Sequence, residues 1–84
     1  MTQAAQKTRV LVVEDNEDVR QVIKVYLSSR GFEVIEAADG LAGLERAAER
    51  PDLILLDVLL PKIDGIEVLR RLRATPGGSG ITVV

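Results

Sequence analysis

Short apolar runs alternate with amphipathic stretches along the chain, and this alternation predicts a succession of strands and helices. Residues 9–13 (RVLVV) and 53–56 (LILL) consist almost wholly of aliphatic residues, a pattern typical of strands buried on both faces of a parallel sheet. Residues 32–37 mix polar and apolar positions and fit a strand at the edge of a sheet. Residues 81–84 (ITVV) begin a fourth strand.

Between these runs, apolar residues recur at the three- and four-residue spacing of amphipathic helices. The predicted inner faces are Val19, Val22, Ile23, Tyr26 and Leu27 in the first helix, Leu41, Leu44, Ala47 and Ala48 in the second, and Ile66, Leu69 and Leu72 in the third. We expect Asp15 or Asn16 to cap the first helix, and Gly31 to take the left-handed conformation after its end. Asp39-Gly40 opens the second helix, and Asp64-Gly65 opens the third.

The predicted order is therefore β-α-β-α-β-α-β, with helices of the right length to connect parallel strands. Right-handed crossovers of this kind give an α/β fold of the doubly wound class, with a parallel sheet covered by helices. A chain of 84 residues has room for one small domain and no more. Residues 1–8 are polar and form a predicted disordered N-terminal tail.

Composition narrows the chemistry that this fold can support. The chain has no cysteine and no histidine, so any metal ion must be a hard cation bound by oxygen atoms. A net charge of -2 and a 2% aromatic content argue against direct binding of nucleic acid. No apolar run approaches the length of a membrane span, and we expect a cytoplasmic protein.

Acidic residues follow two of the predicted buried strands. Glu14 and Asp15 come directly after the first, and Asp57 comes directly after the third. If these strands are neighbours, the three carboxylates meet at one edge of the sheet, where a divalent cation such as Mg²⁺ would relieve their repulsion. Alone, Asp15 could simply cap a helix and Asp57 could simply end a strand; their combination favours a site.

These residues resemble a known signalling family. The sequence VVEDN at 12–16, the isolated Asp57, LP at 60–61 and DG at 64–65 are similar to the receiver domain of two-component response regulators, a CheY-like, flavodoxin-like fold. The resemblance implies that Asp57 is the phospho-acceptor and that a sensor histidine kinase is the phosphodonor. It also implies Mg²⁺ binding by Glu14, Asp15, Asp57 and the main-chain carbonyl of Leu59. Such a domain is a signalling module and not an enzyme.

The chain also departs from this family. Receivers have five βα units, whereas residues 9–84 form a partial receiver that stops inside the fourth strand, with about four strands and three helices. The family's Ser/Thr after the fourth strand and the Lys of the fifth strand have no counterpart. An open sheet edge or face leads us to expect a homodimer or larger assembly. The alternative function is a truncated receiver fragment that acts only in structure or self-association, without phosphorylation.

Two further classes fit less well. A phosphatase or phosphotransferase that uses Asp57 as a turnover nucleophile needs a second acid close after it, but position 59 is Leu. A nucleotide-binding protein of the Rossmann or P-loop class needs a glycine-rich phosphate loop after the first strand, and that loop is absent.

Overall fold

A computed structural model describes residues 7–56, 65–74 and 80–84 of the chain. Its strands are β1 (Arg9–Val13), β2 (Glu33–Ala37), β3 (Leu53–Leu56) and β4 (Thr82–Val83), and its helices are α1 (Glu17–Ser29), α2 (Gly40–Ala47) and α3 (Gly65–Ala74). Most of the predicted tail at 1–8 and the predicted cap at Asp64 lie outside the described residues.

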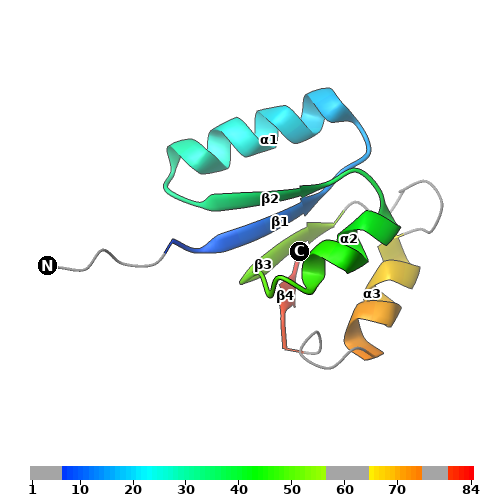
Figure 1. The fold of residues 1–84 in the computed structure, drawn as a ribbon. Coiled ribbons are helices and arrows are strands. Elements are labelled where there is room, and N and C mark those ends of the chain that lie inside the picture. Colours follow the sequence, from blue (N-terminus) through cyan, green and yellow to red (C-terminus); the bar gives the residue numbers. More distant parts are fainter. Residues whose placement is uncertain (1–6, 57–64, 75–79) are drawn as a thin grey trace, which may run out of the picture.

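The four strands form one parallel sheet in the order β2-β1-β3-β4, which confirms the predicted fold class (Figure 1). The apolar strand β1 lies inside the sheet between β2 and β3, while the more polar β2 lies at an edge as expected. Val13 at the end of β1 is in register with both Ala37 and Leu56. The first three strands therefore end at the same edge of the sheet.

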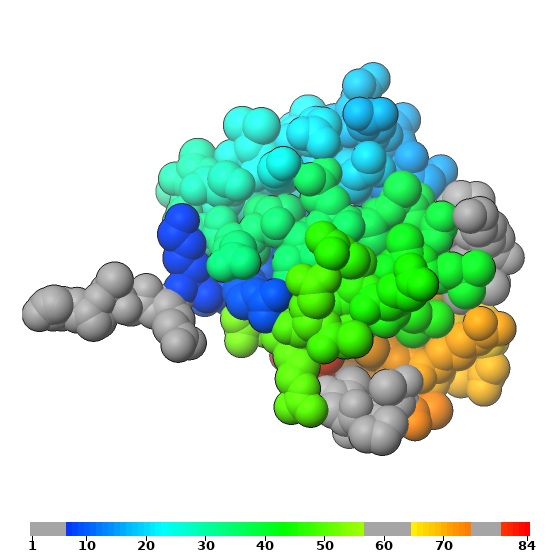
Figure 2. All heavy atoms as spheres, viewed as in Figure 1, coloured from blue at the N-terminus to red at the C-terminus, as the bar shows by residue number. Residues whose placement is uncertain are grey.

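Helices cover both faces of the sheet, with α1 on one face and α2 and α3 on the other (Figure 1). The main core lies between the sheet and the helices α2 and α3. It is made of Leu11, Val13, Ile35, Ala37, Ala47, Ile54, Val68, Leu72 and Ile81. Figure 2 shows the same view with all heavy atoms, and in it α1, β2 and α2 form one continuous surface. The interior strand β1 supplies the most deeply buried side chains, Val10, Leu11, Val12 and Val13.

The predicted inner face of α1 is only partly correct. Ile23 and Leu27 are half-buried against the sheet, but Val22 and Tyr26 are 68% and 57% exposed, and no residue of α1 is fully buried. Within the described residues α1 is the single helix on its face of the sheet. Its contact with the sheet is consequently a narrow strip, and the rest of its apolar side remains at the surface.

The inner faces of the other two helices also differ from prediction. In α2 the buried positions are Gly40, Gly43 and Ala47; Leu44 packs at the core margin, while Leu41 and Ala48 are exposed. In α3 the buried positions are Gly65, Val68 and Leu72; Leu69 is half-buried and Ile66 is exposed. Because Gly43 lets the backbone of α2 approach Val13 of the sheet closely, small residues occupy the contact where larger apolar ones were expected.

Local signals at the helix ends behave as predicted. Asn16 Oδ1 accepts a hydrogen bond from the Val19 N–H at 3.0 Å, which makes Asn16 the cap of α1. Gly31, after the end of α1, has a φ of 91°, a conformation that glycine adopts without strain.

No helix in the described parts of the chain is both long and apolar enough to cross a membrane.

Candidate functional site

The candidate site lies at the edge of the sheet where β1 and β3 end. Val13 and Leu56, the last residues of these neighbouring strands, are in register, so the chain leaves both strands at the same level. Glu14 and Asp15 follow Val13 immediately. Asp57 follows Leu56 in the sequence, but Asp57 and Leu59 lie outside the described residues. The structure thus supports the predicted meeting of the two strand ends and describes two of the four predicted site residues.

Glu14 is half-buried, and its backbone is hydrogen-bonded on both sides. Its N–H donates to the Ala37 carbonyl at 3.0 Å, which continues the β1–β2 pairing one residue beyond β1. Its carbonyl oxygen accepts a hydrogen bond from Arg20 Nη1 at 2.8 Å. Its side-chain Oε2 accepts from the Asn16 N–H at 3.1 Å. The position of Glu14 is therefore set by three different parts of the molecule.

Asp15 is exposed in the bend between β1 and α1. The sequence left either Asp15 or Asn16 as the cap of α1, and the structure assigns that role to Asn16. The Asp15 side chain is therefore not the group that caps the helix. An exposed carboxylate beside a strand end is free to reach a ligand that enters from solvent, which suits a cation site.

Arg20 and Glu36 form a polar connection behind Glu14 that was not predicted from the sequence. Arg20 Nε donates to Glu36 Oε1 at 3.3 Å, while Nη1 of the same guanidinium reaches Glu14. Gln21 Nε2 also donates to Glu36 Oε1, at 3.0 Å, and Lys24 Nζ lies 3.1 Å from Oε2. A sequence signal exists: Arg20 precedes the half-buried Ile23 and Leu27 by three and seven residues, so a charged residue occupies the buried strip of α1.

The Glu36 carboxylate is stabilised in its charged form. Burial by itself would raise the pKa of Glu36, but hydrogen bonds and positive charges from Lys24 and Arg20 outweigh burial and lower the pKa below its ordinary value of 4.5. Glu36 therefore stays ionised at neutral pH and keeps its attraction for the Arg20 guanidinium.

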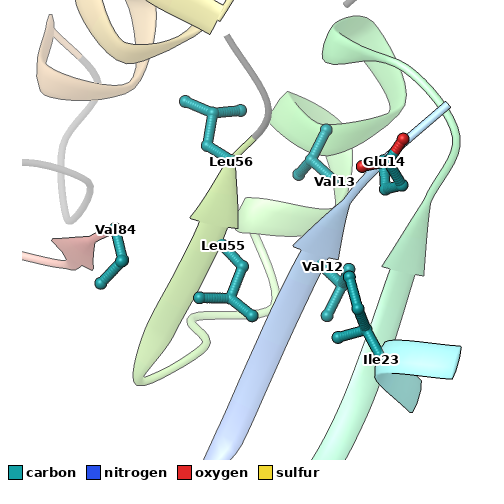
Figure 3. A pocket seen from close by; sticks show the side chains of 7 residues that line it. All are labelled: Val12, Val13, Glu14, Ile23, Leu55, Leu56 and Val84. Atoms are coloured by element: carbon teal, nitrogen blue, oxygen red, sulfur yellow. The ribbon is translucent and has the colours of Figure 1, made fainter. Parts of the chain in front are cut away.

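A hollow of about 310 Å³ opens beside these strand ends on the face of the sheet that α1 covers. Its lining is apolar except for Glu14, and comprises Val12, Val13, Glu14, Ile23, Leu55, Leu56 and Val84. Figure 3 shows the Glu14 carboxylate just past the arrowhead of β1, above the side chains of Val12 and Ile23. An acidic group at the rim of an apolar hollow suits a small hard ligand better than an apolar one.

The donor atoms available here fit a hard divalent cation. Glu14 and Asp15 offer carboxylate oxygens, and the chain has no thiol or imidazole that would favour a softer metal. Within the described ranges no group of three or more acidic residues is assembled around a common point. A complete cation site thus needs oxygen ligands beyond Glu14 and Asp15. That Asp57 and the Leu59 carbonyl contribute stays a prediction, because both residues lie outside the described ranges.

Comparison with known proteins places these observations in a family context. Residues 10–84 match the family model described as the response regulator receiver domain. The chain is 48% identical over 66 residues to the alkaline phosphatase synthesis transcriptional regulatory protein PhoP of Bacillus subtilis, a match that covers 77% of this chain and 28% of the relative. The chain thus spans less than a third of the length of this curated relative.

Solved receivers have the same fold. The chemotaxis response regulator CheY4 of Vibrio cholerae superposes with a TM-score of 0.89 at 32% identity, covering 93% of this chain and 66% of that one. The receiver domain of sensor histidine kinase PA1611 from Pseudomonas aeruginosa gives a TM-score of 0.88 at 35% identity, covering 93% and 65%. That structure is described with a magnesium ion coordinated in its active-site cleft.

Proposed function

Because the chain belongs to the response regulator receiver domain family of two-component signalling, we propose that Asp57 accepts a phosphoryl group from a partner histidine kinase. The observation that supports this most directly is the register of Val13 with Leu56, which brings Glu14 and Asp15 to the edge of the sheet where the strand before Asp57 ends. A carboxylate that follows a buried strand at this edge is suitably placed for reaction with an incoming ligand.

The proposed reaction is a transfer between two side chains. A carboxylate oxygen of Asp57 attacks phosphorus, the bond from phosphorus to the donor's imidazole nitrogen breaks, and that nitrogen keeps the electron pair and takes up a proton. The product is an acyl phosphate on Asp57. A histidine donor must lie outside these 84 residues, because they contain no histidine.

A bound Mg²⁺ would neutralise charge on the transferring phosphoryl group. The proposed ligands are the carboxylates of Glu14, Asp15 and Asp57, with Glu14 acting through a water molecule, and the main-chain carbonyl of Leu59. Glu14 is held at the strand end by the hydrogen bonds described above, Asp15 follows it directly, and all four residues supply oxygen atoms. The magnesium ion in the Pseudomonas receiver supports the same choice of metal.

The proposal is tested by intact-mass measurement after incubation with Mg²⁺ and a small phosphodonor such as acetyl phosphate. We expect the wild-type chain to gain the mass of one phosphoryl group and the Asp57→Asn variant to gain none. Asp18→Asn is the matched control, because Asp18 is an exposed aspartate in the first turn of α1. An adduct that survives Asp57→Asn, or no adduct on any variant, would show that Asp57 is not the acceptor in this polypeptide.

We also propose that the 84-residue polypeptide pairs with a second copy of itself along β4. Within the described residues β4 is the outer strand on its side of the sheet and pairs only with β3. Val84 is 71% exposed and lines two hollows, the one beside Glu14 and another of about 290 Å³ next to α3. Two identical edges can satisfy each other's backbone groups and cover both valines, so a second copy is the occupant that fits.

A further inference from the structure

We propose that Arg20 is a positioning residue for the cation site, because it holds the peptide that joins Glu14 to Asp15 in place. This inference rests on the proposed function, in which both carboxylates serve the bound cation. Arg20 lies on α1 and its side chain is only 13% exposed, so the guanidinium is held inside the protein and not free in solvent.

The first step is the hydrogen bond from Arg20 Nη1 to the carbonyl oxygen of Glu14, at 2.8 Å. This carbonyl belongs to the peptide group whose nitrogen is that of Asp15. On the other side of Glu14, the N–H is bonded to Ala37 at 3.0 Å. Both peptide groups that flank Glu14 are therefore fixed, one by the sheet and one by Arg20.

The second step is the orientation of Arg20 itself. Its Nε donates to Glu36 on β2 at 3.3 Å, so the planar guanidinium is held by one group on β2 and by another on the residue that follows β1. Glu36 is in turn held by Gln21 and Lys24, which lie on the same helix as Arg20. The guanidinium is thus oriented before any cation arrives, and this reduces the entropy lost on binding.

The third step concerns charge. A guanidinium close to a cation site should repel the cation unless its own charge is neutralised. Glu36, whose side chain is 27% exposed, supplies a carboxylate in contact with the guanidinium and offsets its charge. Arg20 can then contribute geometry to the site with little of its electrostatic cost.

The positive charge of Arg20 should lower the affinity for a cation, whereas its positioning of the Glu14–Asp15 peptide should raise that affinity. This difference makes the inference testable. If Arg20 acts only as a nearby positive charge, its removal strengthens cation binding. If Arg20 positions the Glu14–Asp15 peptide, its removal weakens cation binding, since groups that orient metal ligands contribute roughly 10–100-fold to affinity. Arg20 contacts the backbone of a ligand residue and not the ligand atoms, so we expect the lower end, about tenfold.

The experiment is a titration with Mn²⁺ as the probe, with free Mn²⁺ measured by electron paramagnetic resonance. We expect Arg20→Ala to raise the Mn²⁺ dissociation constant about tenfold. Arg46→Ala is the matched control: it removes an arginine that pairs with Glu49 at the end of α2, outside the connection from Arg20 to Glu36, so its dissociation constant should stay unchanged. Circular dichroism at the titration temperature establishes that each variant is folded.

Arg20→Lys keeps the positive charge, and it tests the positioning role even if Arg20→Ala does not fold. A single ammonium group cannot reproduce the two-edged contact of the guanidinium, so we expect weaker Mn²⁺ binding, whereas a purely electrostatic role predicts no change. Unchanged or tighter binding in both Arg20 variants would overturn the inference and leave the proposed function intact. Absence of Mn²⁺ binding by the wild-type chain would overturn the cation site and this inference together.

Discussion

Gly43 of α2 lies so close to Val13 of β1 that a Cβ atom added at Gly43 would meet Val13 Cγ2 at 2.9 Å and Cγ1 at 3.1 Å. Val13 is 1% exposed, and it is the last residue of the strand that leads into Glu14. The packing of α2 is therefore linked directly to the strand end that forms the candidate site.

We expect Gly43→Ala to destabilise the fold. Overpacking in a closely packed core costs about 1–3 kcal/mol, and the better helix propensity of alanine offsets about 0.5–1 kcal/mol of that. The net loss in the free energy of unfolding should be about 1 kcal/mol, measurable by urea denaturation. Gly80→Ala is the control, because a Cβ there meets nothing within 4 Å; an equal loss in both variants would contradict the close contact with Val13.

The cap of α1 gives a second stability prediction. Asn16→Ala removes the side-chain acceptor for the Val19 N–H and should lower the free energy of unfolding by about 1 kcal/mol. Asn16→Ser keeps an oxygen that can accept the same bond and should recover most of the loss. The measurement is thermal unfolding followed by circular dichroism. Equal stability of the Ala and Ser variants would argue against the capping role.

The stability of the fold at acidic pH depends in part on Glu67 in α3. Hydrogen bonds from Arg70 and then Arg71 lower the pKa of Glu67 from 4.5 to about 2. Since the folded-state pKa is depressed, the stabilisation from Glu67 is present above about pH 4.5 and is lost as the pH falls toward 2. Glu67→Gln should therefore be less stable than the wild type at pH 6, and the difference should shrink toward pH 2.

Thermal unfolding of both proteins from pH 6 to pH 2 isolates this contribution, because the other acidic groups titrate in both. A difference that stays constant across this range would show that the Glu67 charge does not stabilise the fold. Arg70→Gln offers an independent check, since it removes the charged hydrogen-bond partner that lowers the Glu67 pKa most. It should bring the Glu67 pKa closer to its ordinary value.

The proposed self-association through β4 predicts a specific effect of Val84. Val84→Glu places a charge at the shared margin of the two apolar hollows and should shift the mass measured by light scattering toward the monomer. Val22→Glu is matched in chemistry and in exposure, 68% against 71%, but lies on α1 away from β4. A monomeric wild type, or an equal effect of both substitutions, would contradict the proposed interface.

Which strands lie inside the sheet was predictable because burial on both faces leaves a clear record in the sequence. Strands β1 and β3 are almost purely aliphatic, and both lie inside the sheet, whereas the mixed β2 lies at its edge. The meeting of Glu14 and Asp15 with the end of β3 was expected only if these two strands are neighbours, and the structure supplies that relationship. The inner faces of the helices were harder to predict, since Val22, Leu41 and Ile66 satisfy the helical period and are nonetheless exposed.

The reason is that hydrophobic periodicity detects only apolar side chains. The packing of a helix on the sheet depends also on how closely the helix backbone approaches the strand. Gly43 lies too close to Val13 of β1 for a Cβ atom to fit without a shift, and glycine has no side chain that hydrophobic periodicity could detect. The connection from Arg20 to Glu36 joins residues 16 apart in the sequence on different elements, and it becomes visible only when α1 is placed over the sheet.

The central place of β1 has a consequence for how the chain folds as it is synthesised. Of the described strands, β1 is synthesised first and yet lies inside the sheet, so its pairing on one side must wait for β3, as the register of Val10 with Leu53 shows. Until then the aliphatic run RVLVV has an unpaired edge, and such edges favour aggregation of nascent chains. Truncations that end before β3 should therefore accumulate as insoluble protein, whereas chains that include β3 can bury this strand.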